Sequence, residues 1–430
     1  MPKPKTVYLG LSGGVDSSVS ALLLKQQGYK VVGVYMKNWS RDLPGHKCPW
    51  ARDLADAKRI ATRLDIDFKI FDFETDYKQK VVDYMLAEYK KGNTPNPDIM
   101  CNQEIKFKLF ADLAFEQGAD LIATGHYARV GRAGEGEDEL TDLKCDLNSR
   151  ARTPAGGFLP GEESRNSNQS VHLLRAIDSN KDQTYFLYRI PQEALAKTIF
   201  PIGHLTKPEV KKLASENNLH TATKPESMGI CFVGKVGIRE FLSQYFSENP
   251  GEIRDIATNE ILGTHDGAIF YTIGQRHGLD LGGGLPYYIV KKDMKTNTLY
   301  VSRNLNAPDL WTTTLELRDV ILRGEAITES IRAKTGDPER AILGGGRRRT
   351  PIENSVRNGG GDRQDPKYPD DEPVFAPRSV QVRLRHRAPL IPAILKNTTL
   401  AFPDPIKRPA PGQSAVLYSG EICLGGGIII

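Results

Sequence analysis

The chain has 430 residues and a mass of 47.7 kDa, a length that suggests two or three domains. Hydrophobic residues make up 39% and charged residues 26%, a globular balance that argues against wholesale disorder or a fibrous repeat. The formal net charge of +5 is too small to identify a partner by itself. No apolar run approaches the ~18–20 residues that span a bilayer, and the N-terminus lacks a secretory signal or transit peptide. We therefore expect a cytoplasmic protein without a membrane partner.

The first 130 residues alternate between strand-like and helix-like segments. Strands are predicted at 5–12, 31–39, 68–73 and 119–124, and helices at 17–27, 51–64, 75–91 and 103–117. This alternation predicts an α/β fold with a doubly wound parallel sheet, which binds ligands at the carboxyl ends of its strands.

Two polar segments interrupt this pattern, at 131–170 and 325–377. The first contains eight acidic and five basic residues, and the second contains ten acidic and nine basic residues. We interpret both as solvated insertions. Because they are net acidic, the rest of the chain is more basic than the whole.

The second half of the chain changes from helices to short strands. The pattern from Thr206 to Glu209 is a capping box that predicts a helix to about residue 217. Short strands follow, at 268–273, 287–290, 299–302, 380–384 and 415–418. They predict a small C-terminal antiparallel barrel or sandwich. We expect three domains, at 1–200, 201–278 and 279–430.

A glycine-rich sequence lies where the first strand ends and the first helix begins. We call Gly10-Leu11-Ser12-Gly13-Gly14-Val15-Asp16-Ser17-Ser18 the glycine loop. Its glycines let the backbone approach a phosphate closely, and the following helix directs N–H groups and a positive dipole end at a bound anion. Asp16 cannot bind phosphate directly, so we expect it to hold Mg²⁺. The glycine loop therefore predicts a nucleotide-phosphate site.

Two competing motifs fit less well. Residues 10–14 match the G-x-S-x-G elbow of hydrolases, but they lie on the first strand, and the adjoining Asp16 and Ser17 suit phosphate and metal better. Residues 229–235 resemble a Walker A loop, but Val236 replaces its Ser or Thr and no strand precedes it.

The five cysteines form no Cys-x-x-Cys pair, which predicts free thiols rather than a disulfide framework or a zinc site. Cys101 lies at a predicted loop–helix junction near Lys106 and Lys108, which predicts a lowered pKa and a nucleophilic thiolate. Cys231 is flanked by glycines, which favours a mobile loop. The remaining cysteines are more often small buried hydrophobes.

The segment from Ser12 to Ser17 is the signature of the PP-loop ATP pyrophosphatases, and further motifs resemble the tRNA-specific 2-thiouridylase family. They occur in the order of that family over most of the chain outside the insertions. The matching segments are the glycine loop, 36–39, 96–108, 123–129, 181–187, 227–234, 271–276, 385–387, 411–416 and 424–427.

The resemblance implies a PP-loop ATP-binding catalytic domain, a central tRNA-contacting domain and a β-barrel. It implies ATP-dependent adenylation of C2 of the wobble uridine in tRNA, then sulfur transfer from a cysteine persulfide to give 2-thiouridine, AMP and pyrophosphate. The implied cofactors are ATP and Mg²⁺. The implied partners are tRNAs with wobble uridines, for Lys, Glu and Gln, and a persulfide donor such as a cysteine desulfurase or relay protein.

The resemblance also assigns roles to individual positions. Cys231 matches the persulfide carrier, Cys101 matches its partner thiol, which can close a disulfide with it, and Asp98 matches a general acid/base. The ATP-binding positions are Gly10, Leu11, Ser12, Gly13, Gly14, Val15, Asp16, Ser17, Met36 and Gly125. The tRNA-binding positions are Asn96, Pro97, Asp98, His126, Lys181, Asp182, Gln183, Arg385, His386 and Gln413.

The chain departs from the family pattern at His386, where a Tyr is usual, and in its two large insertions. Arg383, Arg385 and Arg387 alternate along a predicted strand, so we expect them to share one face suited to phosphate contact.

Three alternatives remain at this point. An amidotransferase-like ligase would use ammonia as the nucleophile, but it needs a glutaminase. A non-catalytic tRNA-binding or sulfur-carrier protein would not need an intact glycine loop. An iron–sulfur cluster on Asp98, Cys101 and Cys231 would have only three ligands and is not favoured.

Overall fold

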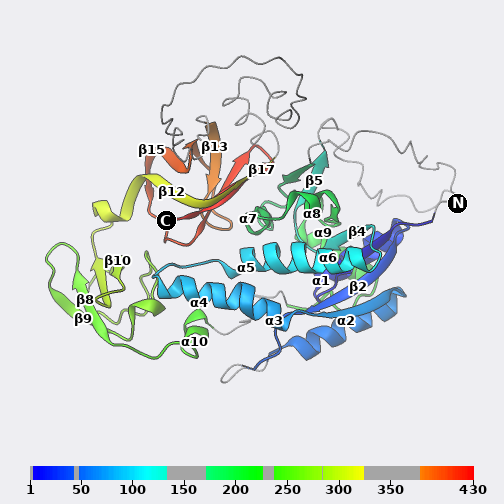
Figure 1. The fold of residues 1–430 in the computed structure, drawn as a ribbon, viewed down its shortest axis with the longest axis horizontal. Helices are drawn as coiled ribbons and strands as arrows, with labels where there is room; N and C mark the ends of the chain where they lie inside the picture. The colour runs from blue at the N-terminus through cyan, green and yellow to red at the C-terminus, as the bar shows by residue number, and fades with distance from the viewer. Residues whose placement is uncertain (1–2, 43–47, 133–170, 226–236, 283, 324–377) are drawn as a thin grey trace, which may run out of the picture.

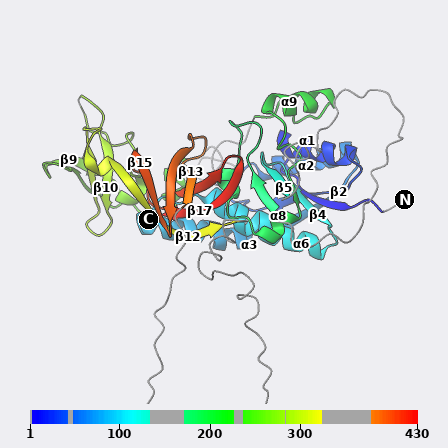
Figure 2. The same cartoon turned by 90° about the horizontal axis from the view of Figure 1, so that it is seen from above.

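The computed structural model describes residues 3–42, 48–132, 171–225, 237–282, 284–323 and 378–430. Figure 1 and Figure 2 show three bodies in a row: an α/β domain with the N-terminus, a β-barrel with the C-terminus, and a small sheet at the far end. Cys145, Cys231, the insertion at 325–377 and almost all of 131–170 lie outside the described residues. None of the helices in the described ranges combines the length and apolarity needed to span a bilayer.

The N-terminal domain is built on a parallel sheet with the strand order β3-β2-β1-β4-β7. The strands are β1 (Thr6–Gly10), β2 (Lys30–Lys37), β3 (Asp67–Asp72), β4 (Leu121–Thr124) and β7 (Thr198–Ile199). From β1 the chain adds β2 and β3 on one side and then β4 and β7 on the other, so the strand order reverses between β1 and β4. Ligands bind at such a switch point. The predicted doubly wound sheet is thus confirmed.

Helices cover both faces of this sheet because successive side chains of each strand point to opposite faces. Leu9 of β1 packs into one apolar cluster with α1 (Val15–Gln26), α2 (Trp50–Leu64) and α9 (Lys207–Glu216). Tyr8 points the other way, into a second cluster. Since α9 packs on α1, the predicted boundary after residue 200 falls inside the N-terminal domain.

Two long helices cover the second face. One runs through α3 (Glu74–Tyr77), a π-helical stretch (Lys78–Val82) and α4 (Asp83–Lys90). The other runs through α5 (Pro97–Met100), a π-helical stretch (Cys101–Leu109) and α6 (Phe110–Glu116). The second helix begins before the predicted residue 103, because Asn96 caps it and Pro97 occupies its first turn.

The small sheet at the far end has the strand order β10-β11-β8-β9. Its elements are α10 (Ile238–Leu242), β8 (Gly251–Asp255), β9 (Ile261–His265), β10 (Tyr288–Asp293) and β11 (Thr298–Ser302). The predicted boundary after residue 278 divides this sheet. The predicted strand at 268–273 is wrong, because Gly267 turns the chain at φ +144° into a 3₁₀ turn (Ala268–Phe270).

The C-terminal barrel closes through pairing of its first and last strands, β12 and β17. A 3₁₀ turn (Pro308–Leu310) precedes it. Its six strands, in sheet order, are β12 (Trp311–Leu322), β15 (Thr399–Lys407), β14 (Ile391–Lys396), β13 (Arg378–Arg383), β16 (Ser414–Ser419) and β17 (Ile422–Ile429). The predicted antiparallel barrel is confirmed.

A hairpin of the N-terminal domain extends the barrel. Strand β17 pairs with β6 (Val171–Leu174), which pairs with β5 (Arg129–Arg132). Helices α7 (Thr184–Leu187) and α8 (Gln192–Ala196) then lead to β7. The barrel therefore shares a continuous sheet with the N-terminal domain.

Candidate functional site

The glycine loop forms a cradle at the carboxyl end of β1. Gly13 has φ +75°, and a Cβ there would lie 2.3 Å from the Asp53 carbonyl of α2, so the position requires glycine. The hydroxyls of Ser12 and Ser17 lie 3.1 Å apart, and Ser17 donates to the Gly14 carbonyl at 3.1 Å. The first N–H groups of α1 have no partner within the helix. These donors give the loop the chemistry of an anion site.

Two of the predicted nucleotide-binding residues flank the cradle. A Cβ on Gly10 would lie 2.8 Å from Met36 Cε, so Met36 packs directly over the end of β1. A Cβ on Gly125 would lie 2.8 Å from the Ser17 backbone nitrogen. The structure therefore brings together all the segments predicted to bind ATP. Two of those positions have buried side chains and offer only backbone groups, Leu11 and Val15.

Asp16 is held by two groups that sequence reasoning did not single out. Its Oδ1 accepts hydrogen bonds from Tyr127 Oη at 2.9 Å and from Lys207 Nζ at 2.6 Å. Its side chain is 33% exposed. Among the described residues, no group of three or more His, Cys, Asp or Glu side chains could hold a metal ion. A single carboxylate beside a phosphate cradle still fits Mg²⁺, which takes phosphate oxygens and waters as its other ligands.

Asp98 and Cys101 share one face of the second long helix, at i and i+3. Cys101 is 1% exposed, and burial raises the pKa of its thiol to about 11 despite the nearby Lys106. The predicted lowering of this pKa is wrong, because Cys101 lies one turn inside the helix within the apolar cluster. The described cysteines are free, as predicted: Cys48, Cys101 and Cys423.

His126 connects this helix to the cradle. It follows Gly125 directly, its Nδ1 lies 2.8 Å from Thr124 Oγ1, and its Nε2 lies 3.5 Å from Lys106 Nζ. Burial, and then the charge of Lys106, hold the pKa of His126 well below its usual range. The imidazole is therefore neutral at physiological pH, between the nucleotide cradle and the helix with Cys101.

Lys181, Asp182 and Gln183, which are predicted to bind tRNA, differ in their exposure to solvent. Gln183 accepts the Tyr127 backbone N–H at 2.9 Å. The Asp182 side chain is 0% exposed and accepts from Arg383 at 2.7 Å and from the Thr184 hydroxyl at 2.9 Å. Lys181 is partly exposed. Asp182 thus joins the N-terminal domain to the barrel, whereas Lys181 and Gln183 are both partly exposed.

The three alternating arginines do not share a face, contrary to the prediction. Strand β13 ends at Arg383, which points inward to Asp182. Arg385 lies in the following turn and Arg387 has φ +63°, so the strand cannot continue through them. Arg385 and Arg387 are exposed. Only these two can offer their guanidinium groups to a phosphate.

His386 takes part in an aromatic contact at the same turn. Its ring lies 4.7 Å from that of Phe186. Burial lowers the pKa of His386 to about 4, with the charges of Arg387 and Arg383 acting in the same direction. The neutral ring therefore offers a stacking surface at this turn.

Thr94, which sequence reasoning missed, lies where the three bodies meet, two residues before Asn96. Its N–H donates to the Pro411 carbonyl at 2.7 Å, and its carbonyl accepts from Gln413 Nε2 at 2.6 Å. Its hydroxyl lies 3.3 Å from that of Thr272. The barrel and the far sheet therefore both hold the loop that leads into Asn96, Pro97 and Asp98.

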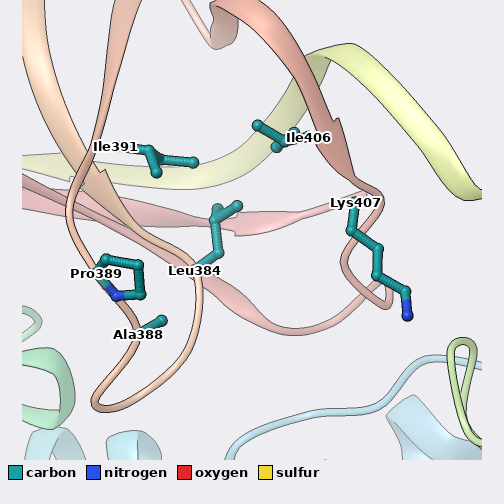
Figure 3. A pocket seen from close by; sticks show the side chains of 6 residues that line it. All are labelled: Leu384, Ala388, Pro389, Ile391, Ile406 and Lys407. Carbon is teal, nitrogen blue, oxygen red and sulfur yellow. The ribbon is translucent and has the colours of Figure 1, made fainter.

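An apolar groove of about 260 Å³ opens on the barrel, beside the turn that carries Arg385 and His386 (Figure 3). The turn between β13 and β14 and the end of β15 form it. None of its lining residues belongs to the glycine loop or to α5; they are Leu384, Ala388, Pro389, Ile391, Ile406 and Lys407.

Three family models match the chain in succession. They are the tRNA methyl transferase HUP domain over residues 5–235, the tRNA methyl transferase PRC-barrel domain over 239–303 and the aminomethyltransferase beta-barrel domain over 363–429. These bounds agree with the strand pairing, which places β10 and β11 in the central body rather than the barrel.

Curated relatives align with the whole chain. It is 37% identical to the tRNA-specific 2-thiouridylase MnmA of Lactococcus lactis subsp. lactis (strain IL1403), over 100% of this chain and 95% of the relative. It is 40% identical to MnmA 1 of Geobacillus kaustophilus (strain HTA426), over 99% and 96%. It is 38% identical to MnmA of Yersinia pestis (strain Pestoides F), over 99% and 96%. The chain therefore belongs to the tRNA-specific 2-thiouridylase family.

Proposed function

We propose that this protein is a tRNA-uridine 2-sulfurtransferase that uses ATP to replace the C2 oxygen of a wobble uridine with sulfur. One observation carries the proposal: the cradle and the helix with Asp98 and Cys101 are neighbours, joined by the contact between His126 and Lys106. The names of the three relatives support the same activity. An activating site and a thiol-bearing site are the two parts that such a reaction needs.

The first step is adenylation of the uridine. The N–H groups of the glycine loop bind the phosphates of ATP. Asp16 would hold Mg²⁺, which would supply positive charge against the departing pyrophosphate. The C2 oxygen attacks the α-phosphate, forming a C–O–P linkage and releasing pyrophosphate. This converts a poor leaving oxygen into AMP. We expect Asp98, which lies in the first turn of α5, to accept the proton that the uridine loses in this step.

The second step is sulfur transfer. The terminal sulfur of a Cys231 persulfide attacks C2 and AMP leaves; Cys101 then attacks the persulfide bond, which gives a Cys101–Cys231 disulfide and passes sulfur to the base. An external thiol must reduce this disulfide before the next turnover. Because burial keeps Cys101 protonated, it is unreactive until the site rearranges.

The chain leading to Cys231 starts next to the cradle. Pro225 is the last described residue before it, and the preceding Lys224 lies 3.0 Å from the Gly13 carbonyl. Six further residues then lead to Cys231, and they span at most about 22 Å at ~3.6 Å each. The start of this segment beside the cradle supports the role of Cys231 as the sulfur carrier.

The test is mass spectrometry of digested tRNA after incubation with the protein, Mg·ATP and a persulfide source. Exchange of oxygen for sulfur raises the mass of one uridine by about 16 daltons, whereas amination by ammonia would lower it by about 1 dalton. A wild-type protein that leaves every uridine unchanged while the tRNA stays intact would contradict the proposal. Cys231→Ser should abolish the mass gain but retain tRNA-dependent AMP formation, which separates sulfur delivery from activation.

A further inference from the structure

Lys224 lies behind the glycine loop and is not part of any motif that defines the nucleotide site. Its Nζ donates to the Gly13 carbonyl at 3.0 Å, to Asp53 Oδ1 at 2.8 Å and to Asp56 Oδ2 at 2.6 Å. An ammonium group has three donors, so these contacts use all of them. The side chain is 17% exposed. Lys224 is therefore fixed in place rather than free to follow a ligand.

The contact with Gly13 sets the direction of the next N–H group. In a trans peptide the carbonyl oxygen and the following N–H point to opposite sides of the chain. Since Lys224 holds the Gly13 oxygen on the outer side, the Gly14 N–H points into the cradle. Among the described residues its acceptor there is Ser12 Oγ, at 3.4 Å, which is long for a hydrogen bond. A phosphate oxygen would be a better acceptor for the same N–H.

Lys224 also balances charge next to the cradle. Asp53 and Asp56 lie on α2 directly behind Gly13, and a Cβ at Gly13 would contact the Asp53 backbone. The Asp56 carboxylate additionally lies 3.3 Å from His220. Without Lys224, the negative charges of Asp53 and Asp56 would be less neutralised when a polyphosphate binds. Like charges repel strongly where water is partly excluded.

We infer that Lys224 is a positioning residue, which orients the Gly13–Gly14 peptide and screens the carboxylates of α2 so that the glycine loop binds pyrophosphate-containing ligands. This inference rests on the proposed function, because it assumes that the loop binds ATP. It assigns Lys224 no contact with the reacting atoms.

The test compares Lys224→Met, Lys224→Arg and Lys58→Met. Lys58 is exposed on the same helix α2 and serves as the matched control. Calorimetry measures the Kd of inorganic pyrophosphate and of Mg·ATP without tRNA, and steady-state kinetics measure the KM of ATP and of tRNA. Because hydrogen bonds to charged groups are the stronger class, we expect Lys224→Met to weaken pyrophosphate and ATP binding by about tenfold or more. The KM of tRNA should stay within about twofold.

Lys224→Arg retains the charge and should recover most of the ATP affinity, and Lys58→Met should bind like the wild type. Unchanged pyrophosphate and ATP affinity in Lys224→Met would overturn the inference. If Lys224→Met does not fold, Lys224→Arg decides. Retained affinity for pyrophosphate supports the inference, and a rise in the KM of tRNA together with a rise in the KM of ATP overturns it. Failure of the proposed function is seen separately, as a wild-type protein that binds pyrophosphate but shows no tRNA-dependent pyrophosphate release.

Discussion

Replacing Arg383 by methionine should destabilise the protein by removing the charge that balances a buried carboxylate. The Asp182 side chain is 0% exposed, and the Arg383 guanidinium lies 2.7 Å from it. Breaking a buried pair by removing one partner typically costs about 3–5 kcal/mol. The Thr184 hydroxyl still donates to Asp182, and Arg175 lies 3.6 Å away, so we expect a loss near the lower end, about 3 kcal/mol.

Urea denaturation followed by circular dichroism measures this loss as a change in the free energy of unfolding. Arg385→Met is the matched control, because Arg385 is exposed on the turn just after β13. It should change stability by no more than about 0.5 kcal/mol. In a tRNA-binding assay we expect Arg385→Met to raise the Kd, since we propose that Arg385 contacts a tRNA phosphate. Equal stability changes in the two variants, or a loss below about 1 kcal/mol in Arg383→Met, would refute the buried-pair interpretation.

Three further predictions concern a thiol, a ring and a glycine. Because burial raises the pKa of Cys101 to about 11 from 9.0, its thiolate should be about 100-fold scarcer than that of an ordinary cysteine. Peptide mapping should find Cys101 alkylated only after the protein is denatured. Fast alkylation of Cys101 in the native protein would contradict its burial. Burial depresses the pKa of His386 to about 4, so the stability that His386 contributes is present above pH 6.5 and lost as the pH falls towards 4. His386→Phe retains the contact with Phe186 and should give a shallower fall in the free energy of unfolding between pH 6.5 and 4. An identical slope in the variant and the wild type would contradict this prediction. Gly412→Ala introduces a Cβ 2.9 Å from the Thr94 nitrogen at φ +88°, so it should lower the free energy of unfolding by about 1–2 kcal/mol and raise the KM of tRNA. Wild-type values in denaturation and kinetics would show that the contact between Gly412 and Thr94 is not needed.

Local sequence patterns predicted the elements that depend on local physics. Alternating strand and helix segments predicted the parallel sheet, and the glycine loop lies where β1 meets α1. The Thr-x-x-Glu pattern correctly located the start of α9, where Glu209 accepts the Thr206 N–H at 2.7 Å. In each case neighbouring residues along the chain make the decisive contacts.

Contacts between distant segments could not be predicted in this way. Arg383 follows the strand alternation of an exposed face, but Asp182, 201 positions earlier in the chain, draws it into the interior. Cys101 has two lysines nearby in sequence, yet its apolar surroundings from other elements dominate its pKa. Lys224 meets the glycine loop across 211 positions. The pairing of β11 with β8, on the two sides of residue 278, is likewise a contact between distant segments.

The central claim is that the uridine C2 oxygen leaves as part of AMP. The most direct test uses tRNA with a heavy-oxygen label at C2 of the wobble uridine, incubated with the protein, Mg·ATP and a persulfide donor. Mass spectrometry of the AMP should find one labelled oxygen for each 2-thiouridine formed. Thiolated tRNA accompanied by unlabelled AMP would contradict adenylation of the base, and with it the joint role of the glycine loop and the two cysteines.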